Sequence, residues 1–299
     1  MNKCADIIVT YNRLELLKEN IEALLNQTYT EHDILIINNA STDNTENYVL
    51  GLTDKRIKYY NTGKNLGGAG GFSYGIEKAI ELGYKYAWIM DDDSIPKKEA
   101  LYSLINKAEM LSNKFSFLAS MVYWTDNKIF PMNLPTFKYK KNLKKNLQIL
   151  SDYKLIEINS CSFVGCFINI EYAKKIALPI SEFFIYGDDV EYTSRLSKEE
   201  KAYFDIESLI IHKAPSNKGA DIATAPKERI QRFYLQSRNG VYIARKNHKM
   251  FERLLRIIKR FFEILLKAPD NKLIRIWMLI KGSFAGLYFN PELKYYNKK

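Results

Sequence analysis

The sequence has few cysteines, and their arrangement excludes two common classes of small protein. Cys4, Cys161 and Cys166 are an odd number without the paired spacing of a zinc site, so neither a disulfide framework nor a zinc module is expected. The N-terminus also lacks a basic stretch followed by an apolar run, the pattern of a secretory signal. We therefore expect a reducing, cytoplasmic setting.

The composition is that of a globular protein whose positive charge is concentrated near the C-terminus. Of 299 residues, 46% are hydrophobic and 13% aromatic, enough for a large core in one extended domain or in a domain with an appendage. Residues 227–299 carry 18 Lys and Arg against 5 Asp and Glu, a net charge of +13, whereas the first 226 residues have a net charge of −2. All the excess positive charge therefore lies in the last quarter of the chain.

Short apolar runs alternate with helical patterns over most of the chain. The runs at 5–11, 33–39, 56–62 and 86–90 are typical of buried strands, and Asn12 is expected to cap the first helix. This alternation predicts an α/β fold with a parallel sheet covered on both faces, in which ligands bind at the carboxyl ends of the strands. The candidate residues that follow the strands are Thr10, Tyr11 and Asn12, then Asn38 and Asn39, then Asp91, Asp92 and Asp93.

Three consecutive carboxylates follow the fourth run, in the stretch WIMDDDSIP. In an extended chain Asp91 and Asp93 point to the same face, whereas Asp92 points away or towards a backbone donor. Two unpaired carboxylates this close repel each other unless a cation lies between them, and hard divalent ions such as Mg²⁺ or Mn²⁺ take oxygen ligands. The alternative is a solvated acidic turn that caps the helix beginning just past Pro96.

A glycine-rich stretch, NLGGAGGF at 65–72, precedes a helical pattern. Gly67, Gly68, Gly70 and Gly71 would let the backbone approach an anionic ligand closely, with the helix N-terminus adding positive potential. The stretch matches neither a dinucleotide fingerprint nor a P-loop. Its alternative interpretation is a tight entry into the helix.

A second acidic group lies far downstream, in FFIYGDDVEYTSRL at 183–196. If a helix begins here, Glu191 lies four residues before Arg195, the favourable order for an ion pair, and Asp188 or Asp189 would stay available as a general base. A capped, salt-bridged helix is the alternative. His212 follows a β-type run, and a lone histidine at a strand end is more often structural than a ligand.

Five segments together resemble a known family. VTYNR, IINNASTDNT, NLGGAGGF, WIMDDDSIP and YGDDVEYTSRL occur in the order seen in inverting family 2 glycosyltransferases with the GT-A fold, and the third and fifth look most like the galactofuranosyltransferase and rhamnosyltransferase branches. The resemblance spans residues 4–246, ending with RFYLQSRNGVYIARK. It implies a Rossmann-like, mainly parallel mixed sheet with helices on both faces, a catalytic domain over 1–226, and a basic helical region over 227–299.

The resemblance also implies roles for the acidic residues. Asp91 and Asp93 would bind a divalent cation, Mn²⁺ or Mg²⁺, that holds the nucleotide diphosphate of the donor, with Asp92 nearby. Asp189, or its neighbour Asp188, would be the base that takes a proton from the acceptor hydroxyl. In galactofuranosyltransferases a histidine downstream of this pair completes the metal site, which makes His212 a metal ligand instead of a structural residue.

Donor recognition would involve residues at two strand ends and in the glycine stretch. The resemblance assigns it to Thr10, Tyr11, Asn12 and Arg13, to Asn38 and Asn39, and to Asn65, Gly67, Gly68, Gly70 and Gly71. The sequence departs from the family at Asn38 and Asn39, where the usual pattern is Asp-Asn, so a uracil N3–H would have to be accepted by an amide oxygen. The best match is transfer of galactofuranose from UDP-galactofuranose to a hydroxyl of a growing, lipid-linked bacterial surface glycan; a dTDP-rhamnose-dependent rhamnosyltransferase is the alternative.

The basic C-terminal region contains an amphipathic pattern at 251–267. An apolar stripe is flanked by cations, the pattern of a helix lying on an anionic membrane surface. The stripe consists of Phe251, Leu254, Leu255, Ile258, Phe262 and Leu265, and the cations mostly off it are Arg253, Arg256, Lys259, Arg260 and Lys267. The next apolar segment is interrupted by Arg275 and Lys281 and is too polar for a membrane-spanning helix. We expect a peripheral location on the inner face of the cell membrane, or else packing of these helices on the catalytic domain or on a second copy of the chain.

Two other function classes explain less of the sequence. A nucleic-acid-binding protein would account for the basic region but not for a slightly acidic main part with carboxylates at strand ends. A Mg²⁺-dependent phosphohydrolase could use Asp91 and Asp93, but it leaves the glycine stretch and the pair Asp188 and Asp189 without a joint purpose. We therefore expect no nucleic-acid partner.

Overall fold

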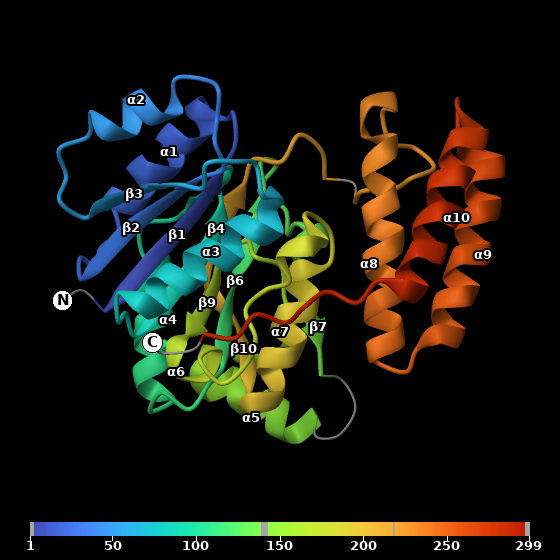
Figure 1. Cartoon of the computed structure of the whole chain (residues 1–299). Coiled ribbons are helices and arrows are strands. Elements are labelled where there is room, and N and C mark those ends of the chain that lie inside the picture. Colours follow the sequence, from blue (N-terminus) through green and yellow to red (C-terminus); the bar gives the residue numbers. More distant parts are fainter. Residues whose placement is uncertain (1–2, 139–142, 218, 297–299) are drawn as a thin grey trace.

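The computed structural model describes residues 3–138, 143–217 and 219–296, and its centre is a ten-stranded mixed β-sheet (Figure 1). Nine strands lie in the order β3-β2-β1-β4-β9-β6-β10-β8-β7, and β5 pairs with β10 off this path. The strands are β1 (Cys4–Thr10), β2 (His32–Asn38), β3 (Ile57–Asn61), β4 (Tyr86–Asp91), β5 (Ser94–Pro96), β6 (Phe117–Trp124), β7 (Thr136–Phe137), β8 (Leu155–Ser160), β9 (Cys166–Asn169) and β10 (Ala202–His212).

The first four strands along the chain form a parallel half of the sheet, as the alternating pattern predicts. β1 lies between β2 and β4, and β3 pairs with the outer side of β2. Because side chains alternate along a strand, Ile7 enters the hydrophobic core on one face of the sheet and Ile8 enters the core on the other. The carboxyl ends of these strands meet at one edge, which brings the residues after β1, β2 and β4 together.

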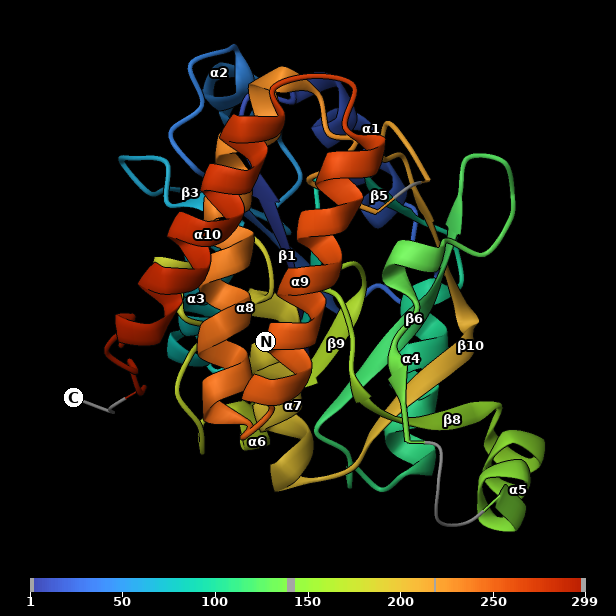
Figure 2. The ribbon, with the colours of Figure 1, turned by 90° about the vertical axis from the view of Figure 1, so that its right-hand side faces the viewer.

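Helices cover both faces of the sheet, and the predicted α/β fold is confirmed. One core includes side chains from α3 (Gly67–Glu81), α6 (Ile170–Ala173) and α7 (Asp188–Glu199). The other includes side chains from α1 (Leu14–Leu25), α2 (Thr45–Leu50) and α4 (Ala100–Met110). α5 (Leu143–Tyr153) precedes β8 at the opposite edge from β3 (Figure 2).

The second half of the sheet is mixed, and it brings a distant residue to the end of β4. β9 lies antiparallel between β4 and β6, and β10 runs parallel to β6. β5, which follows the end of β4 after two residues, pairs antiparallel with the end of β10, so that His212 lies opposite Ser94. His212 and the three aspartates are therefore neighbours although they are far apart in sequence.

The C-terminal region contains three longer helices that follow the short 3₁₀ helix η3 (Lys227–Arg232). They are α8 (Phe233–Lys246), α9 (Met250–Lys267) and α10 (Lys272–Tyr288), and α9 and α10 lie on the outer side of α8 (Figures 1 and 2). Gly282 lets α10 approach α8 closely, because a Cβ there would lie 2.4 Å from the carbonyl oxygen of Tyr234. After α10 the chain returns to the segment that follows α6, where the carbonyl of Lys294 accepts a hydrogen bond from the amide of Leu178 at 2.8 Å.

α9 turns its apolar stripe outwards. All six predicted stripe residues are exposed by between 39% and 71%, so they do not pack on the sheet domain. α9 instead contributes Ile264, with Ile257 and Phe261, to a small core shared with α8 and α10. Within the described ranges, no helix is both long and apolar enough to cross a membrane.

Candidate functional site

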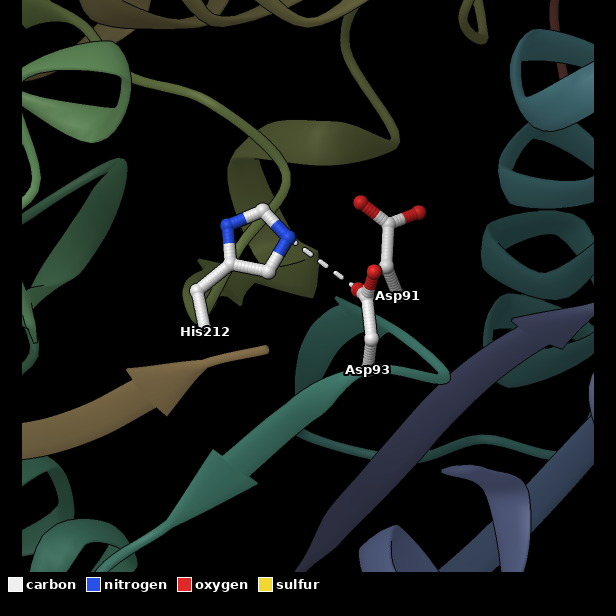
Figure 3. Close-up of side chains that lie close together, drawn as sticks. All are labelled: Asp91, Asp93 and His212. Atoms are coloured by element: carbon white, nitrogen blue, oxygen red, sulfur yellow. Dashed lines mark ion pairs between the residues drawn. The ribbon is translucent and has the colours of Figure 1, made fainter. Parts of the chain in front are cut away.

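The end of β4 and the end of β10 together form a cluster of possible metal ligands (Figure 3). Asp91 is the last residue of β4, Asp93 follows it in the turn before β5, and His212 ends β10. One ligand atom from each of the three side chains lies within 4.8 Å of the others. Asp93 and His212 are buried, and Asp91 is partly buried.

Arg13 and Thr10 hold the middle of the acidic turn. Nη1 of Arg13 donates to Oδ1 of Asp92 at 2.8 Å and to Oδ2 of Asp93 at 2.9 Å. The hydroxyl of Thr10 donates to Oδ2 of Asp92 at 2.8 Å. The sequence suggested that Asp92 points away or towards a backbone donor, but its partners are these two side chains. Arg13 supplies part of the positive charge that three adjacent carboxylates require.

His212 is oriented by a residue that the sequence did not single out. Its Nδ1 lies 2.9 Å from Oδ1 of Asn133, at the end of the 3₁₀ helix η1 (Pro131–Asn133), and its Nε2 lies 3.1 Å from Oδ1 of Asp93. Because Asn133 Oδ1 can only accept, Nδ1 carries the proton, and in the neutral ring Nε2 has a free lone pair directed at the aspartates. Phe130 packs edge-on against the imidazole.

The carboxylates of the cluster differ in their affinity for protons. Burial and the negative charge of Asp93 raise the pKa of Asp91 to about 8, and burial raises the pKa of Asp92 to about 6 despite Arg13 and Thr10. Burial acts in the same direction on Asp93, but His212 and Arg13 outweigh it and lower the pKa of that carboxyl. Of the three neighbouring carboxyls, Asp91 therefore binds a proton most readily in the absence of a cation.

The cluster fits a divalent cation. Oδ1 of Asp93 is buried, and although Nε2 of His212 lies 3.1 Å away, this oxygen has no hydrogen bond of normal geometry among the described residues. Two carboxylates and one imidazole nitrogen are suitable donors for a hard or borderline divalent ion, which would favour ionised Asp91 and satisfy the Asp93 oxygen. The burial of these side chains agrees better with a metal site than with a solvated acidic cap, because a cap would leave the carboxylates in water.

The pair Asp188 and Asp189 begins α7 after a tight turn. Phe184, Tyr186 and Gly187 all have positive φ, at 62°, 72° and 84°. The buried side-chain amide of Asn239 in α8 holds this turn by donating to three of its carbonyls, those of Phe183, Ile185 and Tyr186, at 2.9 to 3.1 Å. Asn239 therefore positions the start of α7, a role that the sequence did not reveal.

Asp188 and Asp189 lie in different surroundings. Asp188 is buried, and burial together with the charge of Asp189 raises its pKa to about 8. Asp189 is partly exposed and lines a cavity of about 650 Å³, and burial raises its pKa to about 6. The predicted ion pair of Glu191 with Arg195 is present at 2.7 Å, so this arginine is not used to neutralise the two aspartates.

The glycine stretch serves packing at three of its four predicted positions. A Cβ at Gly67 would lie 2.1 Å from the carbonyl oxygen of Phe184, one at Gly70 would lie 2.5 Å from Cβ of Leu66, and one at Gly71 would lie 2.5 Å from Cγ1 of Val9. Of the four glycines, only Gly68 has open space where a Cβ would be added. Tight helix entry thus accounts for Gly67, Gly70 and Gly71, and contact of the stretch with a donor stays a prediction.

The other residues predicted to bind the sugar donor form hydrogen bonds within the loops at the strand ends. Asn12 does not cap α1: the helix begins at Leu14 with Arg13 at the N-cap position, the φ of Asn12 is 54°, and its Oδ1 accepts from the amide of Thr42 at 2.7 Å. Asn38 donates to the hydroxyl of Tyr59 and accepts from the amide of Ser41. Both Asn38 and Asn39 are buried.

Two more of these residues complete the loops. Asn39 donates to the carbonyl of Gly67, and Asn65 accepts from the amide of Gly67. Tyr11 is exposed. The residues assigned to the donor therefore form one connected edge of the sheet, and their contact with a nucleotide stays a prediction.

The site thus combines a cluster of possible metal ligands at the ends of β4 and β10 with a second pair of aspartates at the start of α7. The sequence matches the family described as Glycosyl transferase family 2 over residues 7–175, more than half of the chain, and the protein belongs to this family. Galactofuranosyltransferase GlfT1 of Mycolicibacterium smegmatis is 27% identical over 198 residues, which cover 64% of this chain and 64% of that protein. The chain thus spans just under two thirds of this relative's length.

Solved structures share the fold. The TarS 1–349 fragment of S. aureus, solved in complex with UDP-GlcNAc, has a TM-score of 0.57 at 13% identity and covers 93% of this chain and 70% of that one. The mannosyltransferase PcManGT from Pyrobaculum calidifontis, solved in complex with GDP-Man and Mn²⁺, has a TM-score of 0.58 at 13% identity and covers 96% and 87%. These likenesses confirm the predicted GT-A fold.

Proposed function

We propose that this glycosyltransferase is metal-dependent and inverting, and that it transfers galactofuranose from UDP-galactofuranose to a hydroxyl of a lipid-linked bacterial surface glycan. The observation that carries the metal dependence is the buried cluster of Asp91, Asp93 and His212. The likeness to galactofuranosyltransferases, and a structural neighbour solved with a UDP-sugar, support the choice of donor.

The three cluster residues would hold Mn²⁺ or Mg²⁺ at the carboxyl ends of β4 and β10. The imidazole favours Mn²⁺, because Mg²⁺ takes oxygen ligands almost exclusively. When bound, such an ion neutralises charge that grows on the departing diphosphate. Arg13 keeps Asp92 and Asp93 in place, and Asn133 fixes the tautomer and direction of His212.

Asp189 would be the base. It is the member of the pair that lines a cavity, and its raised pKa suits proton abstraction near neutral pH. It would accept the proton of the acceptor hydroxyl as that oxygen attacks the anomeric carbon opposite the diphosphate, which inverts the configuration in one displacement. Asp188 would keep the charge of the pair balanced by holding a proton, since its pKa is about 8.

Calorimetric binding of UDP and dTDP, each with and without Mn²⁺, tests the donor and the metal together. We expect UDP to bind only when Mn²⁺ is present, and Asp93→Ala to lose this binding while its far-UV circular dichroism stays unchanged. Tighter Mn²⁺-dependent binding of dTDP would move the donor to the rhamnose type, the second candidate from the sequence. Metal-independent binding of both nucleotides would contradict the assigned cluster.

We also propose that α9 and α10 attach the catalytic domain, residues 1–226, to the inner face of the cell membrane. Support comes from the exposed stripe on α9 and from exposed apolar residues of α10, among them Leu273, Trp277 and Phe284. Exposed Lys267, Lys272 and Lys281 lie on the same two helices and would meet anionic head groups.

Co-sedimentation with phosphatidylglycerol vesicles tests this attachment. Phe262→Glu combined with Leu266→Glu is expected to abolish sedimentation, because both side chains are exposed on α9. Leu50→Glu is the matched control, since Leu50 on α2 is 63% exposed, between Phe262 at 55% and Leu266 at 82%. If the double variant sediments like the wild type, or if it only converts a dimer to a monomer in gel filtration, the stripe serves another purpose.

A further inference from the structure

The cavity next to Asp189 has a second wall made of cations. α9 turns Arg253, Arg256, Lys259 and Arg260 towards it, whereas none of the three cluster residues Asp91, Asp93 and His212 lines it. The basic residues of α9 therefore share a cavity with the proposed base and not with the metal cluster. A volume of about 650 Å³ is within the range of small-molecule sites.

The carboxylates in the cavity neutralise only part of this charge. Arg260 pairs with Asp221 at 2.6 Å, and Lys259 lies 3.9 Å from Glu263. Arg253 and Arg256 form no ion pair with any residue that the structure describes. Two guanidinium groups thus face the cavity without an ion-pair partner among the described residues.

Arg253 is built into the wall. Its Nη2 donates to the carbonyl of Ser237 in α8 at 3.2 Å, and its guanidinium lies against Gly240, where a Cβ would be only 2.6 Å away. Its Nε is buried and has no hydrogen-bond partner among the described residues. A buried, unsatisfied cationic donor is unfavourable unless a ligand accepts from it. Burial and the neighbouring charges of Arg256 and Arg260 lower the pKa of Arg253 to about 10, which an anion in the cavity would reverse.

We propose that this cavity binds the phosphate or diphosphate group of the glycosyl acceptor, with Arg253 and Arg256 as its anchoring cations. Guanidinium groups match phosphate oxygens in geometry and charge. Asp189 lies in the same cavity, so an anchored acceptor would present a nearby hydroxyl to the base. The proposal rests on the proposed function only in assigning the bound anion to the glycosyl acceptor. Anion binding itself can be measured without any transfer reaction.

Titration calorimetry on the full chain in EDTA, without divalent cations, tests the cavity with inorganic pyrophosphate. We expect Arg256→Gln to weaken pyrophosphate binding about 10- to 100-fold, as the loss of one charged hydrogen-bonding partner predicts, and Arg253→Gln with Arg256→Gln to abolish it. Lys198→Gln is the matched control: it removes one positive charge from an exposed position of α7, the helix that carries Asp189, outside the cavity, and it should bind within about twofold of the wild type.

Farnesyl diphosphate distinguishes the sources of the anion. Tighter binding than pyrophosphate supports a lipid-linked diphosphate, and equal binding supports a phosphate group on a soluble glycan. Absence of pyrophosphate binding by the wild type, or unchanged binding by a double variant that melts at the wild-type temperature, overturns the proposal.

Mn²⁺-dependent UDP binding is measured on the same variants and should stay unchanged. If the wild type fails to bind UDP but binds pyrophosphate, the donor assignment is wrong and the anion site in the cavity is supported. If it binds UDP but not pyrophosphate, only the anion site is wrong.

Discussion

Gly67→Ala tests how the glycine stretch is linked to the segment that carries the proposed base. Gly67 begins α3 with a φ of +68°, and a Cβ at this position would lie 2.1 Å from the carbonyl oxygen and 2.7 Å from Cγ of Phe184. The amide of Ala69 also donates to the carbonyl of Phe184 at 3.2 Å. Alanine would therefore need an unfavourable backbone conformation and would push Phe184 away.

The expected loss of stability is the sum of these two effects. An L-residue in the left-handed region costs about 1–2 kcal/mol. An extra carbon in a closely packed contact costs about 1–3 kcal/mol. We thus expect Gly67→Ala to lower the free energy of unfolding by about 2–5 kcal/mol. Because Phe184 lies four residues before Asp188, the shift should also lower the rate of transfer in the fraction that stays folded.

Urea unfolding followed by tryptophan fluorescence measures the stability, since Trp88 is fully buried. Gly68→Ala is the control: it lies one residue further along the same helix, has no heavy atom within 4 Å of the added Cβ, and does not have a positive φ. Alanine there should stabilise the helix by about 0.5–1 kcal/mol. Equal free energies of unfolding for the two variants would refute the packing argument and return Gly67 to a role in donor binding alone.

Three further changes address the site. Asp91→Asn should abolish Mn²⁺-dependent UDP binding in calorimetry, because an amide cannot replace the ionised ligand; retained binding would exclude Asp91 from the site. Asn133→Ala should weaken Mn²⁺ binding about 10- to 100-fold without a change in fold, since His212 loses the partner of its Nδ1; unchanged affinity would contradict this orienting role. The rate of transfer by the wild type should decrease as the pH is lowered through about 6, because the Asp189 carboxyl, whose pKa is raised to about 6, then binds a proton and is no longer a base. Asp189→Asn should lower the rate of transfer about 10²- to 10⁴-fold, and an unchanged rate would exclude Asp189 as the base.

Local patterns predicted the elements, because they depend on neighbours in sequence. The runs that end near Thr10, Asn38 and Asp91 are strands in the structure, and their alternation with helices predicted the α/β class. The ion pair of Glu191 with Arg195 was predictable for the same reason, since residues four apart on a helix face each other.

The partners within the site were not predictable, because they come from distant segments. Asn133 reaches His212 across 79 positions, and Asn239 reaches the turn before α7 across more than fifty. Arg13 was assigned to the donor from its place after the first strand, but in the structure it also neutralises Asp92 and Asp93. An arginine near a strand end has no local signal that distinguishes these two roles.

The sequence pattern could not predict which way the apolar stripe of α9 faces. Periodicity gives a helix with an apolar stripe and cations off it, but the same periodicity fits a stripe on a core or a stripe on a lipid surface. In the structure the stripe faces solvent, and four of the five cations counted as membrane contacts line the cavity. Each cation near an anionic surface contributes about 1 kcal/mol. Since only Lys267 of the five lies outside the cavity, α9 should attach mainly through its apolar residues, and the dependence on the anionic fraction of the lipid should come from Lys267 together with Lys272 and Lys281 of α10.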